Sequence, residues 1–254
     1  MVECLHCGLV YSNPYFDDET LRPLYREAAY IDEQQLENMS RDYLREFRNA
    51  ADPGDAPHRI LEIGCANGFF LEKLLHAGFT DVYGVEPGED AVHKASPALR
   101  SRIINDFFQP GFFPESSFDV VCCFQIFDHI LDPDRFLCDI RSVLKPGGIL
   151  LAVNHNIRAF ITKVLGEKSP MYDIEHIFLF DKKTIRRIFN ANGFEVTRGA
   201  NLSNSYTLAY AAKMFPFPEW IKSRLVPVLE SGLWGRWNFR VPAGNMVTVG
   251  RKMA

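Results

Sequence analysis

The chain has 254 residues, of which 47% are hydrophobic and 24% charged, which suits one ordinary globular domain with a small appendage. A formal charge of −4 supplies no basic stripe to neutralise phosphates, so nucleic acid is not expected as the main partner. No apolar stretch reaches the length of a membrane span, and the N-terminus lacks the charged-then-apolar order of a signal peptide. Together with cysteines that fall mostly within regular elements, these features predict a cytoplasmic protein with reduced thiols.

Residues 1–16 form a separate segment that carries two of the six cysteines and shows neither helical nor strand periodicity. Its sequence CLHCGLVYSNP resembles the second half of a zinc ribbon, a Cys-x-x-Cys knuckle followed by glycine. A closed zinc site needs four ligands, whereas this segment offers Cys4 and Cys7, with His6 too close to both to share a tetrahedron. We therefore expect a knuckle without metal, and zinc held by Cys4 and Cys7 is the alternative.

Residues 17–58 read as an N-terminal helical region followed by a linker. Apolar residues recur there at spacings of three and four and make one stripe of a helix: Leu36, Met39, Tyr43, Leu44 and Phe47. The stretch ADPGDAPH at 51–58 is rich in Pro, Gly and Asp, which is typical of a linker. A second domain, residues 59–254, is predicted to begin directly after it.

From residue 59 onward, short apolar runs alternate with amphipathic segments, as in crossover units around a parallel sheet. We predict seven strands, at 59–63, 81–85, 102–105, 118–124, 149–155, 194–199 and 246–252. Two stretches have no place in this pattern, 156–180 and 200–245. Both adjoin carboxyl ends of strands, where open α/β sheets bind ligands, so we predict that they form lids.

The stretch LEIGCANGFF at 61–70 is a strand-like run that passes through small residues and then turns helical. Such a turn brings backbone N–H groups and a helix dipole to one point, which suits a polar ligand. A dinucleotide fingerprint requires a small residue at the sixth position from Gly64, where this chain has the bulky Phe69. The small residues are instead Gly64, Ala66 and Gly68, and the carboxylate Glu62 lies two residues before Gly64.

This pattern resembles the first motif of the class I S-adenosylmethionine-dependent methyltransferases, in their small-molecule branch. The match continues in order over residues 59–252, through GVEP at 84–87, NDFF at 105–108, FDVVCCFQIFDHILDP at 118–133 and LKPGGILLAV at 144–153. The resemblance implies an α/β, Rossmann-like fold with helices on both faces of a seven-stranded, mostly parallel sheet. The implied strand order is 3-2-1-4-5-7-6, with strand seven antiparallel. Ala66 departs from the usual glycine and tightens the turn.

The resemblance also assigns residues to the cofactor, S-adenosyl-L-methionine, whose product is S-adenosyl-L-homocysteine. Glu86, followed by Pro87, would bind the ribose, because one carboxylate can accept from both hydroxyls. Asp106 would accept from the adenine amino group or cap a turn, and Phe107 would offer its backbone N–H. Gln125 would face the methionine part or merely pack. Glu62 would orient the loop or bind the methionyl ammonium, and the loop completes the predicted contacts: Gly64, Cys65, Ala66 and Gly68.

Methyl transfer to a hydroxyl group is helped by a general base, and histidine suits neutral pH. Three histidines lie where an acceptor site is expected. His129 follows strand four, where Asp128 could hold its tautomer, His155 ends strand five, and His176 lies in the first predicted lid. Each could instead cap a helix, satisfy a strand-end carbonyl or fix the lid in place. We predict that at least one of the three is the catalytic base.

We therefore expect an S-adenosylmethionine-dependent methyltransferase that acts on a hydroxyl oxygen of a small-molecule acceptor, either sugar-linked or a secondary metabolite. The sugar-linked alternative rests on residues 1–16, because similar knuckles precede some sugar methyltransferases. Transfer to nitrogen or carbon is an alternative, and so is a methyltransferase-like module that binds without catalysis. The aromatic residues of 200–245 could line an acceptor pocket or form a homodimer interface.

Overall fold

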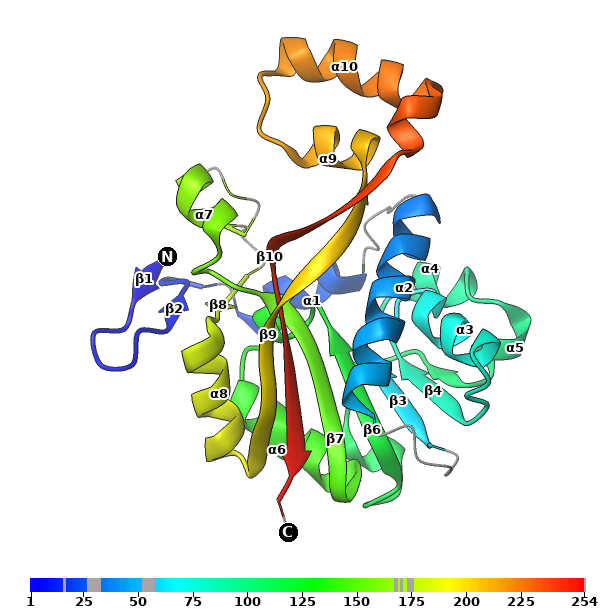
Figure 1. The fold of residues 1–254 in the computed structure, drawn as a ribbon. Coiled ribbons are helices and arrows are strands. Elements are labelled where there is room, and N and C mark those ends of the chain that lie inside the picture. The colour runs from blue at the N-terminus through cyan, green and yellow to red at the C-terminus, as the bar shows by residue number, and fades with distance from the viewer. Residues whose placement is uncertain are drawn as a thin grey trace.

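The computed structural model describes residues 1–15, 17–26, 33–51, 58–166, 169, 171–172 and 176–253. Its centre is a seven-stranded sheet in the order β5-β4-β3-β6-β7-β10-β9 (Figure 1). The strands are β3 (Ile60–Ile63), β4 (Val82–Val85), β5 (Ile103–Ile104), β6 (Phe118–Phe124), β7 (Leu144–His155), β9 (Phe194–Thr207) and β10 (Asn238–Lys252). The first five pair in parallel, and β10 runs antiparallel to both β7 and β9. The predicted fold class and strand order are confirmed.

Helices cover both faces of this sheet. One apolar cluster joins it to α2 (Glu33–Ala50), α3 (Phe69–His76), α4 (Glu89–His93) and α5 (Pro97–Arg100), through residues such as Phe47, Phe70 and Leu99. The second cluster joins it to α6 (Pro133–Val143) and α8 (Lys182–Ala191), through Phe136, Leu137 and Phe189. The apolar stripe predicted for residues 36–47 lies on α2. Most of the linker predicted at 51–58 lies outside the described residues.

The remaining helices are α1 (Asp18–Arg26), α7 (Phe160–Leu165), α9 (Leu208–Met214), α10 (Glu219–Ser231) and the short 3-10 segments Pro110–Phe112, Phe127–His129 and Leu233–Arg236. No helix in the described part of the chain is both long enough and apolar enough to cross a membrane. Helices α7, α9 and α10 all lie at the end of the sheet where the parallel strands finish (Figure 1).

The N-terminal segment forms a second, smaller sheet. Strands β1 (Val2–Glu3) and β2 (Val10–Tyr11) make a hairpin, and β2 pairs with β8 (Phe178–Leu179) from the first predicted lid. Sequence analysis assigned no strand here, because two residues per strand are too few to show an alternating pattern. The backbone N–H of Ser12 continues the pairing by donating to the Ile177 carbonyl at 2.8 Å. The hairpin therefore supports the segment that carries His176.

The last two strands are longer than the sequence predicted. We expected strands at 194–199 and 246–252 with a lid between them, but β9 runs to Thr207 and β10 begins at Asn238. The added residues form a two-stranded ribbon that extends beyond the sheet, and α9 and α10 lie at its far end (Figure 1). In β9 two of the buried positions of this added part are polar, Asn204 and Thr207, and in β10 exposed and partly buried residues alternate, so the added residues lack the continuous apolar signal of the inner strands. The predicted lid at 200–245 is therefore reduced to residues 208–237, which we call the ribbon tip.

Polar contacts join helix α2 to this ribbon. The Asp42 carboxylate accepts from the backbone N–H of Ser205 at 2.6 Å and from its hydroxyl at 3.1 Å. The Asn38 amide donates to the Asn238 side chain at 2.7 Å, and the Gln35 amide donates to the Ser205 carbonyl at 3.2 Å. All three α2 residues are buried, so these hydrogen bonds are shielded from water.

Candidate active site

The loop between β3 and α3 has left-handed backbone at every second residue. Gly64 has φ +75°, Ala66 +48° and Gly68 +75°. Left-handed conformation is strained for residues with a Cβ, which explains why small residues alternate here. A Cβ on Gly64 would in addition lie 2.6 Å from Cγ2 of Ile126. The spacing that sequence analysis singled out is therefore set by backbone conformation, and Ala66 carries strain.

Glu86, directly after β4, holds this loop in place. One oxygen of its carboxylate accepts from the backbone N–H of Ala66 at 2.8 Å, and the other accepts from the N–H of Gly88 at 2.8 Å. Burial raises the pKa of Glu86, while these two N–H groups act in the opposite direction. Each carboxylate oxygen has a second lone pair for a further donor, such as the ribose hydroxyl that the sequence predicts. Pro87 separates Glu86 from Gly88 in the chain.

Glu62 is a buried carboxylate to which the described residues offer no neutralising partner. Its Oε2 atom has no hydrogen-bond partner among the described residues. Burial, together with the nearby Glu86, raises the pKa of Glu62 well above its usual value. Asn67 and Gln125 likewise present buried side-chain oxygens that find no partner in the described part of the chain. Such orphaned acceptors suit a cationic donor, and the ammonium group of S-adenosylmethionine fits this requirement.

Gln125 and Tyr43 lie close to Glu62. Gln125 has φ +58° and donates its backbone N–H to Val153 in β7 at 2.7 Å. Tyr43, from α2, stacks on Phe124 with ring centroids 4.1 Å apart. Burial and the Glu62 charge raise the pKa of the Tyr43 hydroxyl, which the Gln125 side chain hydrogen-bonds. Sequence analysis placed Tyr43 on a core stripe and missed its position beside the site, because its apolar spacing carries no sign of the neighbouring carboxylate.

The remaining predicted cofactor contacts have other partners in this structure. The Asp106 carboxylate accepts from the backbone N–H of Phe107 at 2.8 Å, so both groups are already hydrogen-bonded to each other. The guanidinium of Arg22 lies 4.5 Å from the centroid of the Phe107 ring. Cys65 is fully buried, and a Cβ on Gly84 would lie 2.5 Å from its sulfur. Its side chain therefore points into the core, and it can offer a ligand only backbone groups. Contact of these residues with the adenosyl group stays a prediction.

The three candidate histidines meet in one cluster, although they are distant in sequence. The ring centroid of His176 lies 4.8 Å from that of His129 and 4.9 Å from that of His155. They come from the segment after β6, the end of β7 and the first predicted lid. The carboxyl ends of adjacent parallel strands, which also carry Gly64 and Gln125, bring them together.

His155 has the environment of a neutral base. Its Nδ1 lies 2.9 Å from Oδ1 of Asn245, whose amide group donates to Asn204 at 3.0 Å. This assignment makes Asn245 the acceptor and Nδ1 the protonated nitrogen, which leaves the lone pair of Nε2 for an incoming proton. Burial lowers the pKa of His155, so the neutral form prevails at pH 7. Asn245 belongs to the ribbon, and sequence analysis did not find it.

His176 and Asp128 complete the cluster. Nδ1 of His176 is 2.9 Å from the carbonyl of Met171, an arrangement that requires a proton on this nitrogen. Asp128 is buried, and it accepts from the backbone N–H of His155 at 3.0 Å and from the Asn154 amide at 3.4 Å. Burial raises the pKa of Asp128 to about 6, and the nearby His176 acts in the opposite direction. These contacts tie Asp128 to β7, and the predicted role of Asp128 in holding the tautomer of His129 stays a prediction.

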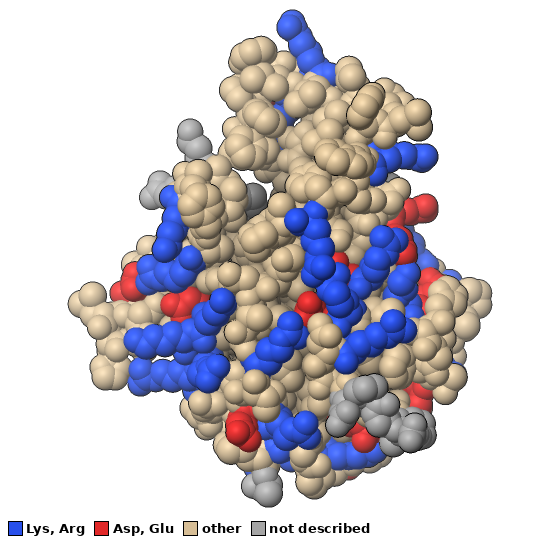
Figure 2. Space-filling view, in the orientation of Figure 1, with Lys and Arg blue, Asp and Glu red and all other residues tan. Residues whose placement is uncertain are grey.

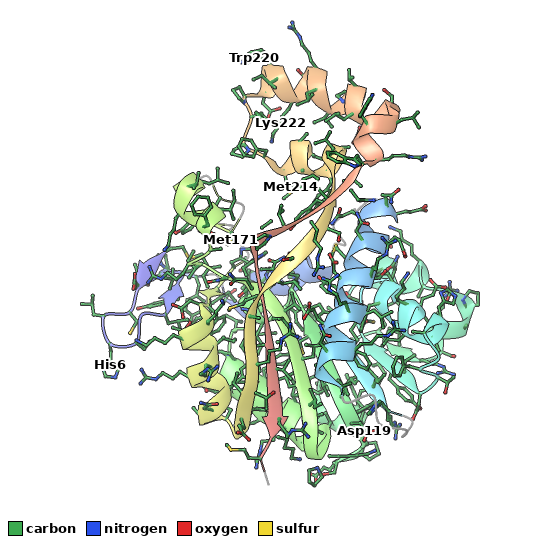
Figure 3. All side chains as sticks on the ribbon, in the orientation of Figure 1. His6, Asp119, Met171, Met214, Trp220 and Lys222 are labelled. Atoms are coloured by element: carbon green, nitrogen blue, oxygen red, sulfur yellow. The ribbon has the colours of Figure 1, made fainter. Side chains whose placement is uncertain are left out.

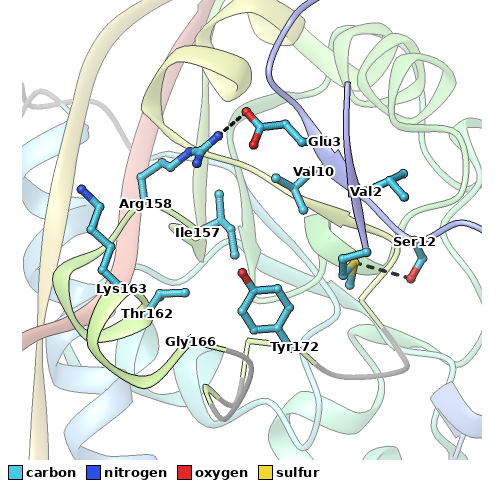
Figure 4. Close-up of a pocket in the computed structure, with 11 residues that line it drawn as sticks. Val2, Glu3, Val10, Ser12, Ile157, Arg158, Thr162, Lys163, Gly166 and Tyr172 are labelled. Carbon is cyan, nitrogen blue, oxygen red and sulfur yellow. Dashed lines mark hydrogen bonds and ion pairs between the residues drawn. The ribbon is translucent and has the colours of Figure 1, made fainter. Parts of the chain in front are cut away.

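A pocket of about 710 Å³ lies between the N-terminal hairpin and α7. Figure 4 shows the ion pair of Glu3 and Arg158 at its rim, with the Tyr172 ring on the other side. This pocket is separate from the glycine loop. The buried acceptor oxygens of Glu62, Asn67 and Gln125 are not among the residues that line this pocket, and the predicted cofactor contacts lie with them rather than in the pocket.

The N-terminal knuckle is an ordered turn. The N–H of Gly8 donates to the Cys4 carbonyl at 2.8 Å, and the N–H groups of Cys7 and His6 hold the pKa of the Cys4 thiol below its usual value. Over the ranges that the structure describes, no group of three His, Cys, Asp or Glu side chains is placed to hold one metal ion. Zinc on Cys4 and Cys7 stays a prediction.

A strand-loop-helix unit with left-handed small residues, followed by a carboxylate at the end of the next strand, is typical of nucleoside-binding α/β proteins. A family model described as a methyltransferase domain matches residues 35–198. The chain belongs to the class I S-adenosylmethionine-dependent methyltransferases.

The individual relatives are distant. The chain is 26% identical over 141 residues to a ubiquinone biosynthesis O-methyltransferase of Psychrobacter cryohalolentis, which covers 51% of this chain and 54% of the relative. It is 29% identical over 121 residues to the enzyme of the same name from Maricaulis maris, over 44% and 47% of the two chains. The chain thus spans about half the length of these relatives. An S-adenosylmethionine-dependent methyltransferase from Aquifex aeolicus shares the fold, with a TM-score of 0.55, 15% identity, and coverage of 94% and 100%.

The loop geometry makes Glu86 the first side chain to test. We expect Glu86→Ala to weaken S-adenosylmethionine binding by about 2–3 kcal/mol, roughly 30- to 150-fold, because it removes a charged contact and the anchor of Ala66. Isothermal titration calorimetry measures this change. Glu89→Ala is the matched control, since Glu89 is exposed at the start of α4, and its affinity should stay at the wild-type value. Equal affinities of both variants would remove Glu86 from the cofactor site.

Proposed function

We propose that this protein transfers the methyl group of S-adenosylmethionine to a hydroxyl oxygen of a small molecule, with His155 as the general base. The observation that carries the proposal is the His155–Asn245 pair, which leaves Nε2 of a neutral imidazole available at the end of β7. The neighbouring strand β6 ends at Phe124, directly before Gln125, and β3, which carries Glu62, pairs with the other edge of β6. The base and the orphaned acceptors therefore lie at the same end of adjacent strands.

When bound, S-adenosylmethionine supplies a methyl group on a positively charged sulfur, so the leaving group needs no acid. Glu62, Asn67 and Gln125 would bind its ammonium group, and Glu86 would bind its ribose. Nε2 of His155 would take the hydroxyl proton as the oxygen–carbon bond forms and the carbon–sulfur bond breaks. Asn245 would then stabilise the imidazolium through Nδ1. The relatives named as O-methyltransferases support oxygen as the acceptor atom.

The test uses S-adenosylmethionine with a deuterated methyl group and a panel of hydroxylated aromatic compounds, sugars and amines. We expect a product three mass units heavier than the unlabelled one, with the label on oxygen according to NMR. A product labelled on nitrogen or carbon would replace the proposal with those alternatives. Cofactor binding without turnover on any acceptor would favour a module that binds without catalysis.

A further inference from the structure

The ribbon tip, residues 208–237, leaves a large apolar surface uncovered. Helix α10 has thirteen residues, and none of them is buried. The exposed fractions are 66% for Trp220, 88% for Leu233, 79% for Trp234 and 66% for Trp237. A protein rarely exposes so many large apolar side chains on one element unless another surface covers them.

Charge on the ribbon tip differs in sign from charge on the whole chain. The tip has four basic residues, Lys213, Lys222, Arg224 and Arg236, against two acidic ones, Glu219 and Glu230, whereas the chain carries −4. Figure 2 shows the tip as a mainly uncharged surface from which Lys and Arg side chains project at the top and at the right side. Trp220 lies at the start of α10, on the outer side of the molecule (Figure 3). This combination favours an anionic surface as the partner.

The tryptophans point to the kind of surface. All three tryptophans of the chain are in the ribbon tip, and each is more than half exposed. Tryptophan is enriched where lipid meets water, because its ring is apolar and its N–H is polar. Helix α7, at the same end of the sheet, adds Phe160 and Val164, which are one turn apart and 80% and 61% exposed. Two separate apolar projections suit an extended lipid surface better than a narrow peptide.

We propose that the ribbon tip, together with the exposed face of α7, docks the protein onto an anionic lipid bilayer. The tryptophans and Leu233 would enter the interfacial region, and Arg224 and Arg236 would pair with lipid phosphates. This inference is independent of the proposed function, because it requires neither a cofactor nor an acceptor.

The chain contains its own probe for the test, since all its tryptophan fluorescence comes from the ribbon tip. The protein is titrated with vesicles of phosphatidylcholine containing a quarter phosphatidylglycerol, and with pure phosphatidylcholine vesicles. We expect a blue shift of the emission and co-sedimentation with the anionic vesicles. The affinity for the neutral vesicles should be at least tenfold lower, and added salt should lower the affinity for the anionic vesicles. Absence of binding to the anionic vesicles would overturn the proposal.

Two variants and a matched control locate the contact. We expect Leu233→Ser combined with Trp234→Ser, and separately Arg224→Glu combined with Arg236→Glu, to weaken vesicle binding at least tenfold. Lys182→Glu combined with Lys183→Glu makes the same change of net charge on α8 and should keep wild-type binding. An equal loss in this control would show nonspecific attraction. Calorimetry with S-adenosylmethionine tests the fold of each variant without vesicles.

A second copy of this chain is the competing occupant. Sedimentation velocity over a range of protein concentrations, without lipid, distinguishes it. If the protein dimerises and the tryptophan emission shifts to the blue with dimerisation, the tip is a dimer interface and the proposal is wrong. A monomer whose emission shifts only with anionic vesicles supports it.

Discussion

Replacing His155 by glutamine is expected to lower kcat by about 10²- to 10⁴-fold, which is the usual contribution of a positioned general base. The affinity for S-adenosylmethionine should stay at the wild-type value, because His155 is not one of the residues predicted to contact the cofactor and Glu86 still holds the loop at Ala66. Single-turnover kinetics with the acceptor from the labelling experiment gives the rate, and calorimetry gives the affinity. Parallel His129→Gln and His176→Gln variants show whether the loss is specific to one histidine.

The pH dependence gives an independent reading of the same residue. The base acts in its neutral form, and burial lowers the pKa of His155 below its usual value. The value of kcat/KM should therefore rise with pH below about 6.5 and be level at neutral pH and above. His155→Gln should abolish this rise. A wild-type profile that still rises above pH 7 would mean that a group other than His155 accepts the hydroxyl proton.

Replacing Gly64 by alanine is expected to destabilise the protein by about 2–5 kcal/mol. The left-handed backbone accounts for about 1–2 kcal/mol of this, and the contact with Ile126 for about 1–3 kcal/mol. Gly78→Ala is the matched control, since Gly78 has φ +95° but no atom within 4 Å of the added Cβ. It should show the backbone contribution alone. Urea unfolding measures both values.

A double-mutant cycle separates the two contributions at Gly64. Ile126→Ala removes the methyl group that lies 2.6 Å from the added Cβ. In that background Gly64→Ala should be about 1–3 kcal/mol less damaging than in the wild-type protein. If the changes in the free energy of unfolding are additive, the loop shifts to avoid Ile126. The conformation described for residues 64–68 would then not be required for stability.

The sheet and its glycine loop were predictable because their signals are local and dense. Buried parallel strands such as Phe118–Phe124 are nearly continuous apolar runs. Residues 64, 66 and 68 all have left-handed backbone, and their small side chains show this directly in the sequence. The strand order came from the resemblance, since periodicity alone assigns no neighbours to a strand.

The histidines were predictable one by one but not as a cluster. Each of His129, His155 and His176 follows or adjoins a strand end, and only the sheet topology shows that they meet. Tyr43 and Asn245 were not predictable as site residues, because they reach the site from α2 and from the ribbon. Their own sequence contexts describe an ordinary helix and an irregular stretch.

The ribbon was underestimated for a related reason. Its two strands pair chiefly with each other beyond the sheet, and its buried positions include polar residues such as Asn204 and Thr207. The pairing register also shifts between Val241 and Asn245, across a proline and Gly244, which breaks any regular alternation. Backbone pairing, which leaves little trace in composition, therefore determines the length of these strands.

The bonds between α2 and the ribbon have a mechanical consequence. Asp42, which binds Ser205 in the ribbon, is the chain neighbour of Tyr43, which packs beside Glu62. Helix α2 therefore connects the ribbon to the surroundings of Glu62 through two adjacent residues. Tilting the ribbon without moving Tyr43 would break buried hydrogen bonds, so a force on the tip is transmitted to the loop by way of two adjacent residues.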